Sequence, residues 1–434
     1  MKVLKFGGTS VGTPQRIKDV ASLISKRGRN IVVLSAMSGT TNSLLQIVDA
    51  IKNGKIDKAS KILKSLKEKY DDVIGQLYSK DEYKDKALTK VSEIFSEIEG
   101  YLCRPYSART EKEIVAKGEM ISTNLMHLYL MEQGVNASLI NALDFMRINA
   151  SGEPDMEYIA AKLPSLLDKD ADLIITQGFI CRNADGLTDN LERGGSDYTA
   201  SILGAVTGAE EVEIWTDIDG MHNNDPRFVE ETRPVRNLHF DEAAELAYFG
   251  AKILHPTCIL PAKLANIPVR LLNTMEPEAE GTLINNELKK GCIKAVAAKD
   301  NITAIKIKSG RMLLAYGFLK KVFEVFEKYE TAIDMVTTSE VGVSLTIDNE
   351  RNLPLILEEL EKFGTVSVDR DMVIICVVGD LEWHNRGFEA SAMEALRNVP
   401  VRMISFGGSN YNITFLINKE DKNKALRLLS YHLF

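Results

Sequence analysis

The chain opens on Met1-Lys2-Val3-Leu4-Lys5-Phe6-Gly7-Gly8-Thr9-Ser10-Val11, an apolar run that ends in two glycines and two hydroxyl residues. Val3–Phe6 predicts a strand, and the glycines predict a turn at its carboxyl end. A lysine followed by two glycines suits an anion, because glycine lets backbone amides approach closely and lysine adds a full charge. The spacing matches neither a Walker A loop nor a GxGxxG fingerprint. Taken alone, Gly-Gly-Thr-Ser after a strand is more often a plain turn than a phosphate site.

The same plan continues to residue 287, with short strands alternating with helical segments. Further strands are expected at Ile31–Ser35, Leu173–Gln177, Glu211–Thr216 and Pro268–Leu272. Helices are expected at Ile17–Lys26, Asn42–Lys52 and Asp197–Thr207. This alternation predicts an α/β fold, a mainly parallel sheet covered by helices on both faces. Ligands of such sheets bind beyond the carboxyl ends of the strands, where the glycine-rich segments fall.

Two segments differ from this plan. Residues 54–118 are rich in charged residues with apolar positions at helical spacing, which predicts an exposed helical excursion without assigned chemistry. From about residue 288 the elements shorten, and strand-helix-strand-strand-helix occurs twice, predicting two ferredoxin-like α+β modules at about 301–370 and 371–434. Within them, separate strands are expected at Val366–Val368 and Met372–Val378, and a helix at His384–Arg397.

Composition excludes several classes of protein. The net charge is −8, from 53 Lys and Arg against 61 Asp and Glu, which argues against a nucleic-acid or anionic-membrane partner. The five cysteines contain no C-x-x-C pair, a usage typical of a reducing cytosol. No apolar run approaches the length of a membrane span, and the N-terminus does not resemble a signal peptide. We therefore expect a cytoplasmic protein.

Further polar motifs could carry chemistry. Arg193-Gly194-Gly195-Ser196-Asp197 opens a predicted helix, with Ser196 or Asp197 expected at the N-cap and the arginine available for a carboxylate or phosphate. Thr216-Asp217 ends a predicted strand, and Asn224-Asp225-Pro226-Arg227 follows it, an arrangement that could hold a nucleotide. Each motif alone is also compatible with an ordinary turn or capped helix. Two more segments are Ala116–Glu119 and Phe249–Pro256, where His255 is expected to be structural.

In their order and spacing, these segments strongly resemble the aspartokinases. The matching stretches are KFGGTSV, SAMSGTTN (Ser35–Asn42), AKGEMIST (Ala116–Thr123), ERGGSDYTA (Glu192–Ala200), WTDIDG with NDPR, and FGAKILHP. Gly317–Thr346 and Met403–Ile413 resemble the paired ACT modules of that family. The resemblance implies an amino-acid-kinase catalytic domain at 1–287 and a regulatory region at 288–434. It also implies phosphorylation of the L-aspartate β-carboxylate by ATP with Mg²⁺, the first step toward lysine, threonine and methionine.

The resemblance implies roles for individual residues. Those near the transferred phosphoryl group are Lys5, Gly7, Gly8 and Asp197. The residues expected to bind the substrate aspartate are Ser35, Thr41, Glu119, Arg193, Gly194, Gly195 and Ser196. Those for ATP are Lys5, Thr216, Asp217, His222, Arg227 and Lys252, with Mg²⁺ held mainly by the phosphates and not by protein ligands. His222 departs from the tyrosine that many relatives carry.

The resemblance also implies regulation by an amino acid. Effector positions are Met312, Gly317, Phe318, Leu319, Asp334 and Ser339, matching lysine-sensitive relatives. L-Lysine is the expected effector, with threonine, or both, left open. The ACT modules are expected to pair in a homodimer, with a tetramer as alternative, and the second module to borrow a strand from about 291–299. Two other functions stay open: another amino-acid kinase, and a catalytically dead amino-acid sensor.

Overall fold

The computed structural model describes residues 1–191, 194–250, 254–310 and 316–434. Their contacts group into two compact units. The first comprises residues 1–221 and 254–286, and the second comprises residues 222–253 and 287–434. The domain boundary expected at 287 stays a prediction, and the contacts add one fact to it: residues 222–253 pack with the later part of the chain.

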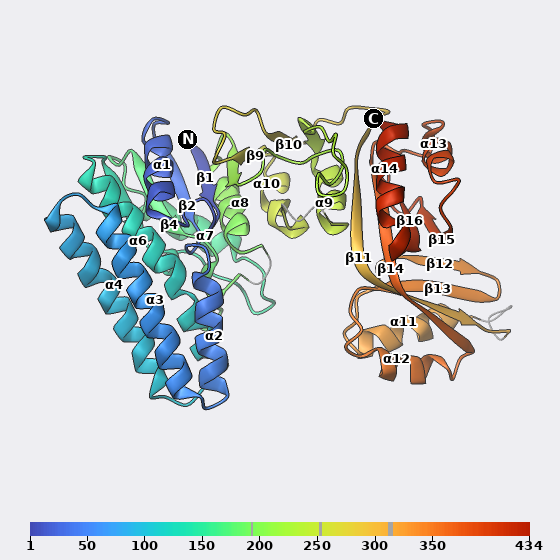
Figure 1. Cartoon of the computed structure of the whole chain (residues 1–434), viewed down its shortest axis with the longest axis horizontal. Helices are drawn as coiled ribbons and strands as arrows, with labels where there is room; N and C mark the ends of the chain where they lie inside the picture. The colour runs from blue at the N-terminus through green and yellow to red at the C-terminus, as the bar shows by residue number, and fades with distance from the viewer. Residues whose placement is uncertain (192–193, 251–253, 311–315) are drawn as a thin grey trace. The chain divides into compact units, whose positions relative to one another are not determined.

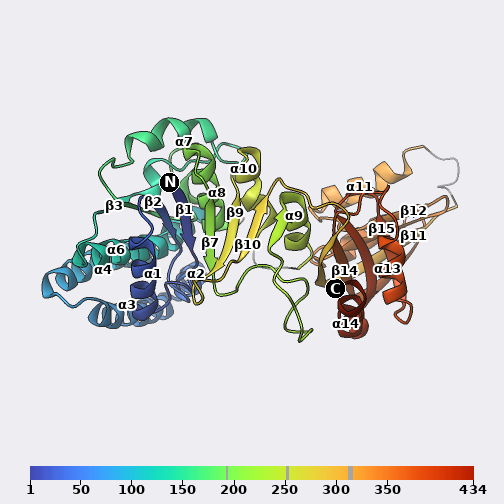
Figure 2. The same ribbon diagram turned by 90° about the horizontal axis from the view of Figure 1, so that it is seen from above.

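The first unit is built on a mainly parallel sheet with strand order β3-β4-β2-β1-β7-β9-β10 (Figure 2). The strands are β1 (Lys2–Phe6), β2 (Asn30–Leu34), β3 (Ala137–Ile140), β4 (Leu173–Gln177), β7 (Val212–Thr216), β9 (Val269–Asn273) and β10 (Thr282–Asn285). Strand β10 runs antiparallel to β9, and the other neighbours pair in parallel. Every residue of β2 and β4 is buried, as expected of strands covered on both faces. The predicted α/β class is confirmed.

Helices of the first unit follow the predicted pattern. They are α1 (Pro14–Ser25), α2 (Thr40–Lys52), α3 (Ile56–Leu77), α4 (Asp81–Leu102), α5 (Ala108–Val115), α6 (Lys117–Glu132), α7 (Met156–Lys162), α8 (Gly195–Thr207) and α10 (Leu260–Leu264). A small hairpin, β5 (Ile180–Arg182) and β6 (Thr188–Asn190), lies outside the sheet. The excursion forms α3, α4 and α5; α4 lies beside α6, and α3 buries its apolar stripe against its neighbours α2 and α4 (Figure 1).

The start of α8 differs from the sequence prediction. Its N-cap is Gly194, at φ +68°, and neither Ser196 nor Asp197. Gly195 also has a positive φ, a backbone region that glycine enters without the penalty a side chain would impose. The helix therefore begins earlier than predicted, and Ser196 and Asp197 lie in its first turn.

The second unit contains an antiparallel sheet with strand order β12-β13-β11-β14-β16-β15. Its strands are β11 (Ile293–Lys308), β12 (Val336–Ser339), β13 (Gly342–Ile347), β14 (Thr365–Gly379), β15 (Val401–Phe406) and β16 (Asn412–Asn418). Its helices are α9 (Phe240–Tyr248), α11 (Phe318–Lys328), α12 (Leu353–Leu360), α13 (Phe388–Ala395) and α14 (Lys422–Leu433), and β8 (Asn237–His239) precedes α9. The unit fits two ferredoxin-like modules, and Figure 1 shows β11 and β14 as its two long strands.

Two predicted boundaries in this unit are wrong. The strands expected at Val366–Val368 and Met372–Val378 form one strand, β14, which continues through Asp371 at φ +54°. The pairing register between β14 and β11 shifts between Lys299 and Ile302. This β-bulge lets β14 stay continuous where the sequence predicted two separate strands. The helix expected from His384 begins only at Phe388, because Gly387 at φ +93° is its N-cap.

Specific contacts hold residues 223–229 against the later part of the second unit. Val229 belongs to the buried apolar cluster around β14, β16 and α14. The Asn224 side-chain amide donates to the Leu426 carbonyl at 3.0 Å, and the Val296 amide donates to the Asn223 carbonyl at 2.8 Å. The loop that carries Arg227 is thus held by β11 and α14.

Among the residues described, no helix is long and apolar enough to cross a membrane.

Candidate active site

The predicted glycine and hydroxyl segments of the first unit meet at the carboxyl ends of its central strands. The Gly7 amide donates to the Trp215 carbonyl at 3.3 Å, and the Ser35 amide donates to the Phe6 carbonyl at 3.2 Å. The loops after β1 and β2 therefore start side by side, with the end of β7 next to them. This edge is where ligands of parallel sheets bind.

Lys5 lies at this edge beside the first turn of α8. Its ammonium is 2.6 Å from Asp197 Oδ1, and the Lys5 and Asp197 side chains are only 11% and 15% exposed. Gly7 lies close to the same ammonium, since a Cβ added there would be 3.7 Å from it. The α8 N-terminus has no side-chain cap, which leaves its first amides available to an anion. The arrangement places one ammonium, paired with the Asp197 carboxylate, beside the amides of a helix N-terminus at the sheet edge.

Glu119 lies in the first turn of α6 and is 4% exposed. Its Oε1 accepts the Ala36 amide at 3.1 Å, while Oε2 is buried with no hydrogen-bond partner among the described residues. Burial raises the pKa of Glu119 to about 7, although the Ala36 amide acts in the opposite direction. A buried carboxylate oxygen without a partner is costly, and an ammonium group would satisfy it.

Hydroxyl groups connect the other residues that are predicted to bind the substrate L-aspartate. Ser35 Oγ donates to Ser196 Oγ at 2.9 Å, which joins the β2 loop to α8. Ser122 Oγ donates to the Ser35 carbonyl at 2.8 Å, a contact that sequence reasoning missed because serine inside a helix carries no distinctive pattern. Thr41 is half-buried in the first turn of α2. The same edge of the sheet therefore has four predicted site residues beside it: Lys5, Ser35, Glu119 and Ser196.

The residues predicted to bind ATP come from both units of the chain. Thr216 and Asp217 end β7 in the first unit, where Thr216 Oγ1 donates to Asp217 Oδ1 at 3.1 Å. Arg227 belongs to the second unit, is 70% exposed, and binds both carboxylate oxygens of Asp225. His222, also in the second unit, shares a hydrogen bond with Thr232 at 2.8 Å. Arg193 and Lys252 lie outside the described residues.

The predicted effector residues that the structure describes all belong to the second unit. Gly317 is the N-cap of α11 at φ +79°, Phe318 and Leu319 begin that helix, and Ser339 ends β12. Met312 lies outside the described residues.

Asp334 is already engaged by other side chains. Its side chain is 1% exposed, and Oδ1 accepts from Lys299 Nζ and from the Tyr248 hydroxyl, each at 2.6 Å. Burial and the neighbouring Asp334 carboxylate raise the pKa of Tyr248 to about 12, which keeps its hydroxyl protonated as a donor. Asp334 Oδ2 is buried and has no hydrogen-bond partner in the described parts of the chain.

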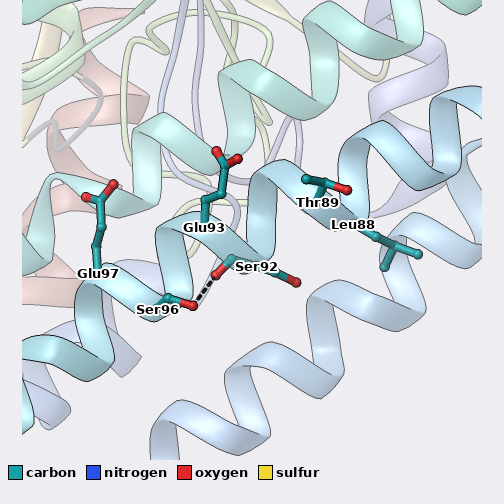
Figure 3. Close-up of a pocket in the computed structure, with 6 residues that line it drawn as sticks. All are labelled: Leu88, Thr89, Ser92, Glu93, Ser96 and Glu97. Carbon is teal, nitrogen blue, oxygen red and sulfur yellow. Dashed lines mark hydrogen bonds between the residues drawn. The ribbon is translucent and has the colours of Figure 1, made fainter.

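The rest of the described chain offers neither a metal-ligand cluster nor a pocket that holds predicted site residues. Within the described ranges, no group of three or more His, Cys, Asp or Glu side chains could hold a metal ion. A shallow hollow of about 830 Å³ lies along α4 (Figure 3), lined by Leu88, Thr89, Ser92, Glu93, Ser96 and Glu97. Ser96 Oγ donates to the Ser92 carbonyl inside the helix. The hollow contains none of the predicted site residues.

Comparisons with known proteins find relatives across the whole chain. The sequence pattern of the Amino acid kinase family matches residues 1–273, and that of an ACT domain matches residues 375–433. Lysine-sensitive aspartokinase 3 of Escherichia coli K12 is 34% identical over 453 residues, which cover 100% of this chain and 99% of the relative.

Two solved structures of E. coli aspartokinase III also match over 100% of both chains, at 32% identity. The complex with aspartate and ADP, described as the R-state, matches with a TM-score of 0.83. The complex with lysine and aspartate, described as the T-state, matches with a TM-score of 0.80.

Proposed function

This chain belongs to the aspartokinase family, and from that membership we infer that it transfers the γ-phosphoryl group of ATP to the β-carboxylate of L-aspartate. The products are 4-phospho-L-aspartate and ADP, and the ACT region makes the enzyme a regulated one. The observation that carries the assignment of the site is the buried Lys5 ammonium beside Gly7 and the uncapped start of α8.

The proposed chemistry relies on positioning and charge. A carboxylate acceptor is ionised near neutral pH, so no general base is required. The barrier comes from bringing an anion against a polyanion, and preorganised positive charge lowers it. Lys5 and the Gly7-Gly8 turn meet the transferring phosphoryl group, with the Gly8 amide as donor because the Gly7 amide donates to the Trp215 carbonyl, and Asp197 orients the Lys5 ammonium.

The two substrates are held by separate groups. Glu119 binds the aspartate ammonium with its unpartnered oxygen, and Arg193 binds the α-carboxylate. Ser35, Thr41, Ser196 and the glycines 194 and 195 complete that pocket. Thr216, Asp217 and His222 hold the nucleoside, while Arg227 and Lys252 hold its phosphates. Mg²⁺ is held mainly by the phosphates, because this ion commonly keeps several waters and needs few protein ligands. A cytoplasmic location and a homodimer or tetramer built through ACT modules stay predictions from the sequence.

An acceptor panel tests the activity. ADP release is measured with ATP and Mg²⁺ over L-aspartate, L-glutamate, N-acetylglutamate and a nucleoside monophosphate, and the acyl phosphate is trapped with hydroxylamine. We expect ADP release and hydroxamate in equal amounts with aspartate alone. Release with another acceptor would identify a different amino-acid kinase, and release with none would favour the catalytically dead sensor.

Feedback inhibition by L-lysine is the expected regulation. A tenfold loss of activity needs about 1.4 kcal/mol of tighter binding to the inhibited state, within the usual range of allosteric coupling. Asp334→Ala should raise the inhibitory lysine concentration at least tenfold, roughly the loss of one charge-assisted contact, with kcat nearly unchanged. Initial rates at subsaturating aspartate across millimolar lysine measure this. Glu361→Ala, on the exposed end of α12, serves as the control. Inhibition by threonine alone, or by neither amino acid, would contradict the assignment.

A further inference from the structure

Helix α3 of the excursion brings two adjacent polar side chains onto the loop between β2 and α2. Lys69 Nζ donates to the Ser38 carbonyl at 2.9 Å. The Tyr70 hydroxyl shares a hydrogen bond with Thr40 Oγ1 at 2.7 Å, and both of these residues are completely buried. The two contacts lie on either side of Gly39, the N-cap of α2. The end of the loop is therefore fixed by a helix that lies outside the sheet.

The same loop contacts both halves of the proposed catalytic arrangement. The Ser38 amide donates to the Gly8 carbonyl at 3.1 Å, so Ser38 links Lys69 to the turn after β1. Two residues earlier, the Ala36 amide donates to Glu119 Oε1 at 3.1 Å. One short segment, residues 35–40, thus touches the proposed phosphoryl-binding turn and the proposed ammonium-binding carboxylate.

Packing leaves this segment little room to adjust. A Cβ added to Gly8 would lie 2.7 Å from the Ala36 carbonyl oxygen, and one added to Gly118 would lie 2.8 Å from Ala36 Cβ. Both distances are shorter than van der Waals contact allows, so glycine is required on each side. A displacement of residues 35–40 would therefore be passed to Gly8 and Glu119 together.

Lys69 and Tyr70 differ from the ordinary residues of α3. Lys61, Lys64 and Lys67 are exposed on the same helix, whereas Lys69 is half-buried and burial lowers its pKa. Tyr70 packs edge-on against Phe95 of α4, at 5.9 Å between ring centroids. Packing alone would be served by phenylalanine, so the buried hydroxyl is explained by its bond to Thr40.

We propose that Lys69 and Tyr70 are positioning residues for phosphoryl transfer. They hold residues 35–40 so that Gly8 and Glu119 keep the separation that the phosphoryl group and the amino acid require. The proposal rests on the roles proposed above for Gly8 and Glu119. It assigns to the helical excursion a part in the reaction that its exposed, lysine-rich sequence does not indicate.

Kinetics of Lys69→Met and Tyr70→Phe test the proposal, with the exposed Lys67→Met as the matched control. Misplacement of reacting groups by about 1 Å can cost roughly 10²-fold in rate, so we expect kcat/KM for aspartate to fall about tenfold in each variant. ADP affinity in the absence of aspartate should stay unchanged, because the nucleoside contacts do not involve this loop. Lys69→Arg, which keeps a cationic donor, should recover most of the loss.

Three outcomes would overturn the proposal. The first is kcat/KM for aspartate within about twofold of the unmodified enzyme in both variants, well below the expected positioning effect. The second is a loss that merely follows the unfolded fraction in thermal melting. The third is an equal loss in Lys67→Met. If Lys69→Met fails to fold, Tyr70→Phe decides, because it removes a single hydroxyl.

A parallel measurement on Glu119→Gln separates this proposal from the proposed function. If Glu119→Gln weakens aspartate while Lys69→Met and Tyr70→Phe are silent, the positioning role is wrong and the site assignment stands. If Glu119→Gln leaves aspartate saturation unchanged, the site assignment itself is wrong.

Discussion

Lys5→Ala should lower kcat by roughly 10²–10³-fold, the usual cost of removing one preorganised charge from a transfer site. The Lys5 ammonium lies at the carboxyl end of β1, is 11% exposed and is held 2.6 Å from Asp197. In the proposed function, this charge meets the phosphoryl group as it is transferred. Alanine leaves the strand and its neighbours in place, so the loss should appear in turnover and not in folding.

Steady-state kinetics and thermal melting of Lys5→Ala measure this effect. Lys2→Ala is the control, because Lys2 lies at the other end of β1 and pairs with Glu211 and Glu213. We expect the control to change stability with little effect on kcat. A folded Lys5→Ala enzyme that retains more than about a tenth of the original kcat would show the assignment to be wrong, given the size of such effects.

Glu119→Gln should raise the KM for aspartate by about tenfold or more, since a hydrogen bond to a charged group contributes roughly 1.5–3 kcal/mol. Glutamine has almost the same shape and keeps an acceptor for the Ala36 amide, but it carries no charge for the substrate ammonium. The effect on the KM for ATP should be small.

The pH dependence provides a second test of Glu119. Burial raises its pKa to about 7, so the carboxylate loses its charge as pH falls through that value. The KM for aspartate should rise about tenfold between roughly pH 8 and pH 6, and this rise should be absent in Glu119→Gln. Arg227→Ala should instead raise the KM for ATP. Equal effects of the Glu119 and Arg227 variants on both substrates would contradict the division of roles.

The sequence predicted the parts of this site that depend on local pattern. Strand β1 and its Gly-Gly turn could be recognised because an apolar run meets glycines, and parallel strands bring such turns to one edge. The role expected of Glu119, in the first turn of α6, came from the resemblance of its motif to the aspartokinases. These features depend on neighbours in sequence, and they need no knowledge of which helix packs where.

The features that the sequence could not predict depend on distant partners. Tyr70 occupies an apolar position in the helical pattern of α3, and nothing nearby indicates that its hydroxyl meets Thr40. Asp334 was predicted as an effector contact, and nothing near it in the sequence indicates that Lys299 and Tyr248 also engage its carboxylate. The continuity of β14 through Asp371 likewise requires the pairing with β11. Each case is set by tertiary packing that local pattern does not encode.

The packing of residues 222–253 with the later part of the chain limits how such an enzyme could exchange its regulatory tail. A recombination at residue 287 would join a foreign tail to the original loop. Val229 would then lose the apolar cluster in which it packs, and Asn224 would lose its hydrogen bond to the Leu426 carbonyl. A viable chimaera would have to transplant residues 222–253 together with the tail. An exchange of the regulatory region therefore has to involve two separate stretches of the gene. One of them encodes Arg227, the residue proposed to hold the phosphates of ATP.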